Sequence, residues 1–573
     1  MSYITHYNHW LNSPALSEAE KAELREIADD AKEIESRFFG RLEFGTGGLR
    51  GIMGVGLYKM NIHIVRHTTQ ALAELILAEP GLSNRTIVIA YDSRNNSREF
   101  AREAACVMAG NGVHVKLFNN PTPTPQLSFA IRHYGAISGI NITASHNPKE
   151  YNGYKVYWSD GAQLPPHHAK VVAEKMDELD IFTSIKSADF DKSVENGLIT
   201  TLAPDIDELF LKNVMAQVSD FDSVTKVADS FRLVYTPFHG GGGKLVPEAF
   251  RRLGLKHIHC VAEQMIPDGN FPTVISPNPE DPEGFELSIA LAEQHCADLI
   301  IGTDPDVDRV GIMVRNDKNK FIALTGNQTG VLLLDYIISA KIRAGTMPEK
   351  PIILKTIVTS EMARRITDSF KLPCYDTFTG FKFMAEKKNA LEASGQGHVV
   401  FSYEESYGYM AGDFARDKDA VTASTLIAEM AAWYAVHGIT LYTALLNLYE
   451  KYGNYGEHTL NLMMPGLDGL NAMRELMTNL RENPPSHIAD VSVTTIRDYL
   501  GGIETDTQTK RETKIELSGS NVLRFILEDG SVVIARPSGT EPKIKIYLMV
   551  SGDTREECDA KLQSLEKWTA TLR

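Results

Sequence analysis

The chain has 573 residues, which corresponds to about four domains of ordinary size. Its 74 Asp+Glu outnumber its 58 Lys+Arg and give a formal net charge of −16, which argues against DNA, RNA or an anionic membrane as the main partner because phosphate-rich partners favour cationic surfaces. Apolar residues make up 43% and charged residues 23%, values that are typical of folded globular protein and exclude the disordered, collagen-like and coiled-coil classes.

The cysteines and the N-terminal segment indicate a reducing compartment. The cysteines are odd in number, lie far apart and form no CxxC pair, so they support neither a disulfide framework nor a cysteine-based zinc site; they are Cys106, Cys260, Cys296, Cys374 and Cys558. The N-terminal segment lacks the apolar stretch of a signal peptide. The most apolar segment, 420–436, contains Thr422, Ser424 and Glu429, which favours a buried helix over a membrane span. We expect a cytoplasmic protein.

Helix and strand patterns alternate through the first three of four blocks. Block 1–204 predicts a helix that opens with the capping box SEAE at 17–20, helices over 67–78 and 97–109, and strands over 86–91 and 113–117. Block 205–325 predicts strands over 233–235, 257–261 and 299–301 and helices over 245–253 and 285–295. Block 326–456 predicts a helix over 329–343, strands over 351–356 and 399–402, and helices that begin at Ser360 and Thr422. This alternation predicts three α/β domains.

The last block, 457–573, has a different pattern. Segments 523–527 and 532–535 flank Asp529-Gly530 and predict a hairpin, followed by a strand over 543–550 and a closing helix over 554–572. Strands outnumber helices here, so we expect a smaller α+β domain at the C-terminus.

Two loops of the first block carry candidate chemistry. The run FGTGGLRGIMGVG at 44–56 contains six glycines, which let backbone N–H groups approach a ligand closely, and Arg50 can hold a phosphate with two hydrogen bonds. A flexible surface loop is the alternative. The run TASHNP at 143–148 places Ser145 after an apolar strand over 136–142, near His146 and Lys155. Serine is a weak nucleophile that needs a base, a metal or a prior modification, and an Asn-Pro turn with a capping serine is the alternative.

The second block contains three carboxylates in close succession. Asp304, Asp306 and Asp308 follow a buried strand at spacings of two residues. Three like charges so close repel one another unless a cation neutralises them or their pKa values rise. Oxygen ligands favour Mg²⁺, and the run lacks the glycine and the glutamate of an EF-hand loop.

Two further loops lie in the last two blocks. The run YEESYGY at 403–409 offers Glu404 and Ser406 to vicinal sugar hydroxyls, although a solvated helix start would explain it equally well. The run RPSGTEPKIK at 536–545 combines hydroxyls, a glycine and an arginine into a candidate phosphate clasp, with a decorated hairpin loop as the alternative. Four glycines at 240–243 are interpreted as a turn, because Leu245 stands where a P-loop needs Ser or Thr.

These five loops, in this order, resemble the α-D-phosphohexomutase family of phosphoglucomutases and phosphomannomutases, and the resemblance runs from Gly45 to Lys545. It implies an α/β architecture in which three α/β domains with mixed sheets and a smaller C-terminal α+β domain surround a central cleft. It also implies a Mg²⁺-dependent isomerase that converts glucose 1-phosphate into glucose 6-phosphate through a phosphoserine and glucose 1,6-bisphosphate. Small sugar phosphates are the implied partners, with the chain a monomer or a dimer.

The resemblance assigns roles at matching positions. One magnesium ion per chain is implied for Ser145, Asp304, Asp306 and Asp308. Catalytic roles are implied for Ser145 as the phosphoserine, Lys155 as the first and His146 as the second candidate proton acceptor, Arg50, Arg309 and Lys382. Substrate binding is implied for Glu404, Ser406, Arg536, Ser538, Gly539, Thr540 and Lys545.

Two departures from the family pattern bear on the substrate, and alternatives to the glucose hypothesis stay open. The sugar loop lacks the histidine that many phosphomannomutases carry, and Lys545 stands where many members have an arginine, which loses the planar fork. Phosphomannomutase and phosphopentomutase activities therefore stay open beside the glucose hypothesis. The segment DVDRV at 306–310 also fits the nucleophile pattern of haloacid-dehalogenase-like phosphatases, but that hypothesis leaves Ser145 and Arg536 without a role. A non-catalytic sugar-phosphate sensor is the third alternative.

Overall fold

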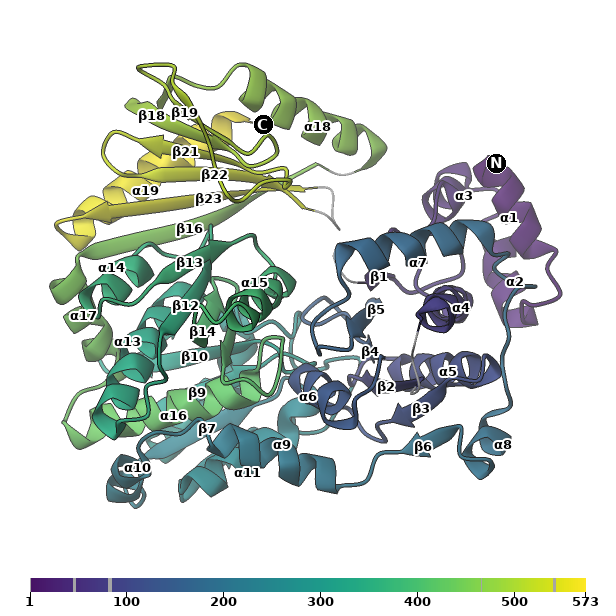
Figure 1. Cartoon of the computed structure of the whole chain (residues 1–573), viewed down its shortest axis with the longest axis horizontal. Helices are drawn as coiled ribbons and strands as arrows, with labels where there is room; N and C mark the ends of the chain where they lie inside the picture. The colour runs from purple at the N-terminus through teal and green to yellow at the C-terminus, as the bar shows by residue number, and fades with distance from the viewer. Residues whose placement is uncertain (1, 45–47, 81–84, 465, 539–542, 573) are drawn as a thin grey trace. The chain divides into compact units, whose positions relative to one another are not determined.

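The computed structural model describes residues 2–44, 48–80, 85–464, 466–538 and 543–572 (Figure 1). The chain forms two compact units, one of Met1–Leu324 with Tyr407–Gly438 and one of Thr325–Ser406 with Ile439–Arg573. The sheets combine parallel and antiparallel pairings and are accompanied by helices, which confirms the expected α/β and α+β classes. The block boundaries at 204, 325 and 456 stay predictions.

Three short helices open the first unit: α1 (Tyr3–Leu11), α2 (Glu18–Glu26) and α3 (Ala31–Phe38). The predicted capping box is confirmed, because the Ser17 hydroxyl accepts the N–H of Glu20 while the Glu20 carboxylate accepts the N–H of Ser17. Trp10 and Phe38 are buried between these helices with their rings edge to face, so the three helices share one apolar core.

The first sheet of this unit has six strands, in the order β1 (Gly48–Ile52), β5 (Tyr151–Trp158), β4 (Ser138–Ile142), β2 (Thr86–Tyr91), β3 (His114–Leu117) and β6 (Ile199–Thr201). The strands β4, β2, β3 and β6 are parallel, while β5 and β1 are added antiparallel. Its helices are α4 (Ile62–Ala78), α5 (Ser97–Gly110), α6 (Thr124–Tyr134), α7 (Pro166–Glu178) and α8 (Phe190–Glu195). Every residue of β2 is buried, as expected for a strand with helices on both faces.

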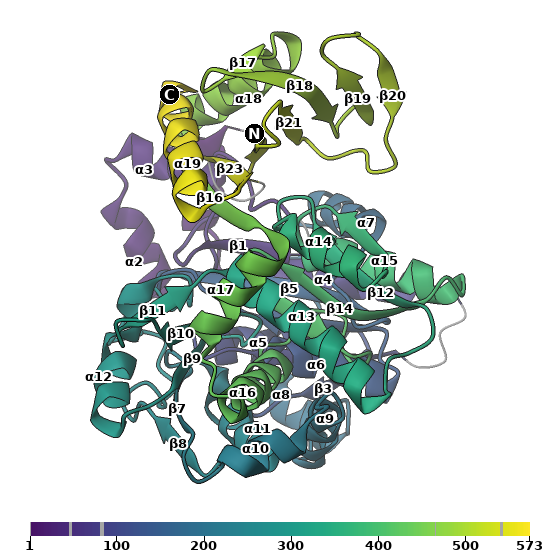
Figure 2. The same cartoon turned by 90° about the vertical axis from the view of Figure 1, so that its left-hand side faces the viewer.

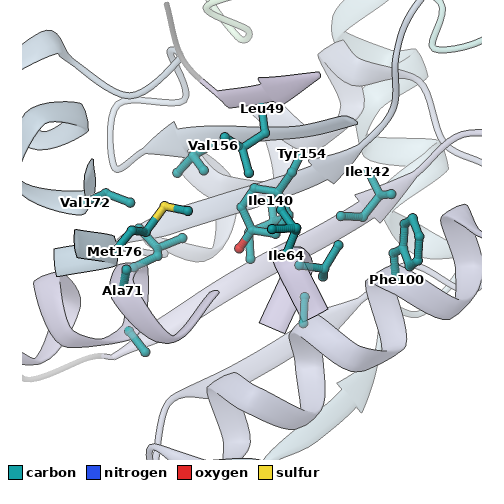
Figure 3. Close-up of a cluster of buried hydrophobic side chains, with 14 of the residues drawn as sticks. Leu49, Ile64, Ala71, Phe100, Ile140, Ile142, Tyr154, Val156, Val172 and Met176 are labelled. Atoms are coloured by element: carbon teal, nitrogen blue, oxygen red, sulfur yellow. The ribbon is translucent and has the colours of Figure 1, made fainter. Parts of the chain in front are cut away.

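Apolar side chains from this sheet and its helices form the main core of the first unit. Figure 3 shows side chains of α4, α5 and α7 gathered against β4 and β5; the labelled ones are Leu49, Ile64, Ala71, Phe100, Ile140, Ile142, Tyr154, Val156, Val172 and Met176. Tyr154 lies within this core and its hydroxyl hydrogen-bonds to Thr69 at 2.9 Å, so the buried polar atom is satisfied. The core fixes β4, which leads into the loop of Ser145, and β5, which contains Lys155.

The second sheet of the unit has the order β11 (Phe321–Leu324), β10 (Val310–Arg315), β9 (Leu299–Thr303), β7 (Arg232–Thr236) and β8 (His257–Cys260). The strands β9, β7 and β8 are parallel, and β10 and β11 continue the sheet antiparallel. The helical elements of this region are α9 (Asp205–Met215), α10 (Phe221–Val227), η1 (Gly241–Gly243), α11 (Leu245–Leu253), η2 (Pro282–Phe285) and α12 (Glu286–His295). The carboxyl end of β9 leads directly into the three aspartates.

A later segment of the chain completes this unit. Strand β15 (Gly408–Ala411) is followed by α16 (Ala420–Val436), which packs against α10 and α11. All but three residues of α16 are buried, which confirms the predicted core helix and explains its apolar composition. Among the described residues, no helix is long and apolar enough to cross a membrane.

The second unit begins with parallel strands in the order β13 (Cys374–Thr377), β12 (Pro351–Thr356) and β14 (His398–Glu404). Its helices are α13 (Gly326–Ala344), α14 (Met362–Ser369), α15 (Phe381–Ala393) and α17 (Leu441–Tyr452). Thr325 and Gln328 form a capping box at the start of α13. The polar residues that follow β12 and β14 meet at one edge of this sheet, because parallel strands end on the same side.

The C-terminal part of the second unit is an antiparallel sheet with two helices (Figures 1 and 2). Its strands follow the order β16 (Asn454–Met463), β23 (Lys543–Gly552), β22 (Val532–Pro537), β21 (Leu523–Leu527), β18 (Val491–Asp498), β19 (Ile503–Asp506) and β20 (Glu512–Lys514), with β17 (His487–Ile488) paired to β18. Helices α18 (Gly466–Glu482) and α19 (Arg555–Thr569) contact β23, and the turn η3 (Ala570–Leu572) follows. The predicted hairpin of β21 and β22 is confirmed.

The two faces of this sheet pack in two different hydrophobic cores. Side chains alternate along β22, so Val533 and Ala535 join the core shared with α18 and α19. Val532 and Ile534 point the other way and pack in a second core with Ile357, which follows β12. The C-terminal sheet and the β12 sheet therefore share buried apolar contacts within the second unit.

Candidate functional site

The loop after β9 has a strained backbone that arranges three carboxylates. Val307 is buried with φ at 57°, a left-handed conformation that β-branched residues rarely adopt. Its carbonyl accepts the N–H of Ala420 at the start of α16 at 3.2 Å. A Cβ at Gly240 would come 2.3 Å from Pro305 Cα, and Gly241 donates its N–H to the Pro305 carbonyl at 2.9 Å. The four glycines therefore form the predicted turn, and their backbone also supports this loop.

Asp304, Asp306 and Asp308 are buried, and one carboxylate oxygen of each lies within 4.8 Å of the others. Burial raises the pKa of Asp304 well above its ordinary value, and its two carboxylate neighbours raise it further. Oδ1 of Asp306 and Oδ1 of Asp308 are buried, and neither accepts a hydrogen bond from any residue that the structure describes. Buried oxygen ligands with unused lone pairs fit a divalent cation such as Mg²⁺, so the carboxylate triad is a credible metal site.

Ser145 lies directly beside this triad. Its Oγ donates a hydrogen bond to Asp304 Oδ2 at 2.8 Å and lies 3.1 Å from Nδ1 of His146. The residue is buried and its φ is 53°, so the serine occupies a strained, left-handed position after β4. The structure thus brings together Ser145, His146 and the carboxylates that the sequence placed in separate blocks.

Two lysines partly neutralise the negative charge of the triad. Lys155 Nζ lies 2.7 Å from Asp306 Oδ2 and 3.1 Å from Asp308 Oδ2, and Lys418 Nζ lies 3.3 Å from the same Asp308 oxygen. Burial disfavours the charged form of Lys155, but its attraction to the two aspartates outweighs burial and raises the pKa of its ammonium group. Burial likewise opposes ionisation of Asp308, yet the lysines hold its pKa below the ordinary range. The two lysines therefore offset part of the negative charge of the triad.

The two arginines predicted for the site contact neighbouring loops through their side chains, and the backbone N–H of Arg309 donates to Asp304 Oδ1 at 3.0 Å. Arg50 Nη1 donates to the side chain of Asn147 at 2.9 Å, in the serine loop. Arg309 Nη1 donates to Glu280 at 2.8 Å. Arg50 lies in β1, so part of the expected glycine-rich loop is a strand, because it pairs with β5; the expectation of a loop over all of 44–56 was wrong there. Gly45, Thr46 and Gly47 of that run lie outside the described residues.

The predicted sugar loop ends β14 in the second unit. Glu404 is buried and Ser406 is half-buried. Between them, Glu405 accepts a hydrogen bond from the Thr356 hydroxyl at 3.2 Å. Burial raises the pKa of Glu405 to about 7, and the neighbouring Glu404 contributes to the rise while Lys545 opposes it. Two adjacent carboxylates at this position offer acceptors for hydroxyl groups.

The predicted phosphate clasp begins at the end of β22. Arg536 and Lys545 are paired across β22 and β23, and Ser538 donates its N–H to the Lys543 carbonyl at 2.8 Å. Arg536 and Lys545 both lower the pKa of Glu405, which places their charges near the sugar loop. Gly539 and Thr540 lie outside the described residues.

Lys382, the other basic residue predicted in this unit, lies in the first turn of α15. Burial lowers the pKa of its ammonium group.

The structure also adds residues that the sequence analysis left out of the site. Lys418 belongs to a run of charged residues after the sugar loop, Glu405 lies within that loop, and Asp92 and Arg94 directly follow β2. The signal for the last pair was available, since polar residues at the end of a buried parallel strand are typical of functional sites.

Comparison with known proteins places the whole chain in one group. Residues 41–181, 208–318, 325–452 and 486–561 match, in this order, the three alpha/beta/alpha domains and the C-terminal domain of phosphoglucomutase/phosphomannomutase. The phosphoglucomutase of Staphylococcus saprophyticus is 34% identical over 536 residues, covering 93% of this chain and 95% of that protein. The phosphoglucomutase of Staphylococcus aureus strain MRSA252 is 33% identical over 545 residues, covering 95% and 96%.

Solved structures show the same fold at lower identity. The open form of the Paramecium phosphoprotein parafusin, a phosphoglucomutase, matches with a TM-score of 0.67 and 18% identity over 92% of this chain and 94% of that one. A phosphoglucomutase/phosphomannomutase family protein of Burkholderia thailandensis matches with a TM-score of 0.63 and 18% identity over 92% and 97%.

Proposed function

The chain belongs to the phosphoglucomutase/phosphomannomutase family, and on that premise we propose that it is a phosphohexomutase, an isomerase that interconverts α-D-glucose 1-phosphate and glucose 6-phosphate through a phosphate carried by Ser145. The observation that carries the proposal is the 2.8 Å hydrogen bond from Ser145 Oγ to Asp304 within a triad of buried carboxylates. The curated relatives named phosphoglucomutase support glucose as the sugar.

The charge of a phosphoserine requires a cation at this place. A phosphoserine carries about −1.5 to −2 charges at neutral pH, and Ser145 already touches one of three clustered aspartates. We propose that Asp304, Asp306, Asp308 and the Ser145 phosphate hold one magnesium ion per chain. When bound, this ion would neutralise the charge that develops on the transferring phosphoryl group.

The residues around Ser145 handle the phosphoryl group and a proton. In the first transfer the bond between phosphorus and Ser145 Oγ breaks while a bond to the sugar 6-hydroxyl oxygen forms. Lys155 is the proposed acceptor of the hydroxyl proton, and His146, 3.1 Å from Ser145 Oγ, is the second candidate. Arg50 and Arg309 supply positive charge to the phosphoryl oxygens.

The residues of the second unit hold the rest of the substrate in this proposal. The phosphate that does not react binds to Arg536, Ser538, Gly539, Thr540 and Lys545, and Lys382 adds a further positive charge. Glu404 and Ser406 accept and donate hydrogen bonds to the sugar hydroxyls. The product of the first transfer is glucose 1,6-bisphosphate, which must turn round so that its other phosphate returns to Ser145. Hydroxyl recognition must therefore tolerate two opposite orientations.

Steady-state kinetics test this function directly. Purified protein is given glucose 1-phosphate with Mg²⁺ and a trace of glucose 1,6-bisphosphate, and the formation of glucose 6-phosphate is measured. The proposal predicts turnover that depends on the bisphosphate, with kcat/KM highest for glucose 1-phosphate among the glucose, mannose and ribose 1-phosphates. A higher kcat/KM for mannose or ribose would reassign the sugar. Steady release of inorganic phosphate, with an acid-labile acyl phosphate on Asp306, would establish the phosphatase alternative instead.

A further inference from the structure

The backbone on both sides of Ser145 is held by buried side chains that have no part in the proposed reaction. Ser145 is a non-glycine residue in the left-handed region, a conformation that persists only where surrounding contacts impose it. The direction of its Oγ toward Asp304 depends on that backbone conformation. The contacts that impose it therefore determine where the phosphate is carried.

Arg94 makes most of these contacts. Its guanidinium is buried, and Nη2 donates to the Ser145 carbonyl at 2.5 Å and to the Asn147 carbonyl. Nη1 donates to the carbonyls of Pro148 at 2.8 Å and Tyr151 at 3.1 Å. One side chain thus satisfies four backbone acceptors of the serine loop, which the planar fork of an arginine can do and a lysine cannot.

Thr143 holds the other side of Ser145. Its hydroxyl oxygen accepts the N–H of Ser145 at 2.8 Å. Burial raises the pKa of Asp92, and the hydrogen bond from the Thr143 hydroxyl opposes that rise. Asp92 also accepts the N–H of Arg94 at 2.9 Å, and its Oδ2 lies 3.3 Å from Arg94 Nε. Asp92 therefore connects the two contacts, one on the N–H of Ser145 and one on its carbonyl.

The cost of this arrangement argues for a role beyond stability. Asp92 Oδ2 and Arg94 Nε are buried, and neither has a hydrogen-bond partner among the described residues. A buried ion pair whose polar atoms lack hydrogen-bond partners stabilises a fold poorly. Apolar side chains of the same size would stabilise it at least as well. The guanidinium also lies over the ring of Phe271, with Cζ 5.1 Å from the ring centroid, a contact that further favours its position.

We infer that Arg94 and Thr143, connected by Asp92, are positioning residues that impose the left-handed backbone of Ser145 and so direct its Oγ, and the phosphate it carries, toward Asp304. This inference rests on the proposed function, because it concerns the residue that carries the phosphate. In this inference, the residues act through the backbone of the serine loop and not on the sugar. Their removal should misplace the phosphoryl group without changing sugar binding.

The first test replaces Arg94 with lysine, which keeps the charge and loses the fork. Arg98→Lys, on the exposed face of α5, is the matched control. The enzyme is phosphorylated with glucose 1,6-bisphosphate, and the single-turnover rate of transfer to glucose 6-phosphate is measured per phosphorylated Ser145, together with kcat and KM. We expect a loss of about 100-fold in the transfer rate of Arg94→Lys with KM within about twofold of wild type, and no loss in Arg98→Lys. A merely structural role would lower the melting temperature and the phosphorylated fraction but not the rate per phosphorylated site.

The second test keeps the inference falsifiable if Arg94→Lys does not fold. Thr143→Val removes the acceptor for the Ser145 N–H, and Thr143→Ser restores it. We expect the transfer rate to fall in Thr143→Val and to recover in Thr143→Ser. Normal transfer rates in Thr143→Val, or in a folded Arg94→Lys, would overturn this inference alone while the wild type stays active. A wild type that does not isomerise any sugar phosphate would overturn the proposed function, and this inference with it.

Discussion

Ser145 Oγ and Asp304 Oδ2 lie 2.8 Å apart although 159 positions separate the two residues in the chain. Ser145 follows β4 of the first sheet, and Asp304 follows β9 of the second. The contact therefore joins the loops after two strands that belong to different sheets of one unit. Under the proposed function, this contact places the serine that carries the phosphate beside the carboxylate triad. The predictions below test its parts.

The carboxylate triad should bind a divalent cation. Asp306→Asn removes one negative ligand, and we expect it to abolish the rise in melting temperature that Mg²⁺ gives the wild type, since a ligand stabilises only the state that binds it. We also expect kcat to fall by about a thousandfold, because the lost charge stabilisation amounts to several kcal/mol. Differential scanning calorimetry with and without Mg²⁺ measures the first effect. Asp317→Asn, in an exposed turn, is the control; an unchanged Mg²⁺ response in Asp306→Asn would contradict the assignment.

Lys155 should matter for proton transfer. Lys155→Met keeps the apolar stem but removes the amine, and we expect kcat to fall by about 100-fold to 10,000-fold, the usual contribution of a general acid or base. Lys170→Met, at an exposed position in α7, should leave kcat unchanged. Steady-state kinetics across pH 6 to about 9 measure the loss and any change in the pH profile. Near-normal kcat in Lys155→Met would transfer the role to His146.

Glu404 should recognise sugar hydroxyls. Glu404→Gln replaces a charged acceptor with a neutral one, and a hydrogen bond to a charged group contributes about 1.5–3 kcal/mol, so we expect kcat/KM to fall about 10-fold to 100-fold. Glu450→Gln, exposed on α17, provides the comparison. If both variants retain wild-type kcat/KM for glucose 1-phosphate, Glu404 does not contact the sugar.

An ion cluster around the buried Lys355 should make the second unit sensitive to acid. Glu361 lies 3.2 Å from Lys355 Nζ and 3.1 Å from Arg524 Nη2. Burial alone would raise the pKa of Glu361, but these cations lower it from 4.5 to about 2. A lowered folded-state pKa means that the pair stabilises the fold above pH 4.5 and that this stabilisation is lost as the pH falls through about 2.

Glu361→Gln should therefore destabilise the second unit by about 3 kcal/mol at pH 7, because it removes one of the two carboxylates, Glu361 and Asp376, that pair with buried Lys355. This corresponds to a fall of roughly 10 °C in its melting temperature, a difference that should shrink as the pH approaches about 2. Glu516→Gln breaks the exposed pair with Lys387 and should change the melting temperature by no more than about 2 °C. Equal melting temperatures for the two variants at pH 7 would show that the cluster contributes little.

The sequence was sufficient to predict the local elements. The strands over 86–91 and 351–356 and the helix over 245–253 have the predicted bounds, because each is set by a continuous apolar pattern with clear end signals. The helix predicted to begin at Thr422 begins two residues earlier, at Ala420. The strand β1 was missed. Its five residues include two glycines and it exists because it pairs with β5, about a hundred positions later, so nothing in its own composition indicates a strand.

The candidate site was predictable in its residue types but not in its contacts. The carboxylate spacing and the serine turn are local patterns, and both stand beside each other in the structure as the resemblance implied. The hydrogen bonds of Arg94 to the serine loop and the approach of Lys418 to Asp308 depend on how β2, β9 and α16 pack, and packing over such sequence separations leaves no local signal.

The central claim is that Ser145 carries the phosphate that moves between the two positions of the sugar. The most direct measurement is mass spectrometry of the intact protein and its peptides after incubation with glucose 1,6-bisphosphate, and again after addition of excess glucose 6-phosphate. The account predicts one acid-stable phosphate on the peptide that contains Ser145, which then leaves as glucose 1,6-bisphosphate without release of inorganic phosphate. An unmodified Ser145, or an acid-labile phosphate on Asp306 that is released to water, would contradict it.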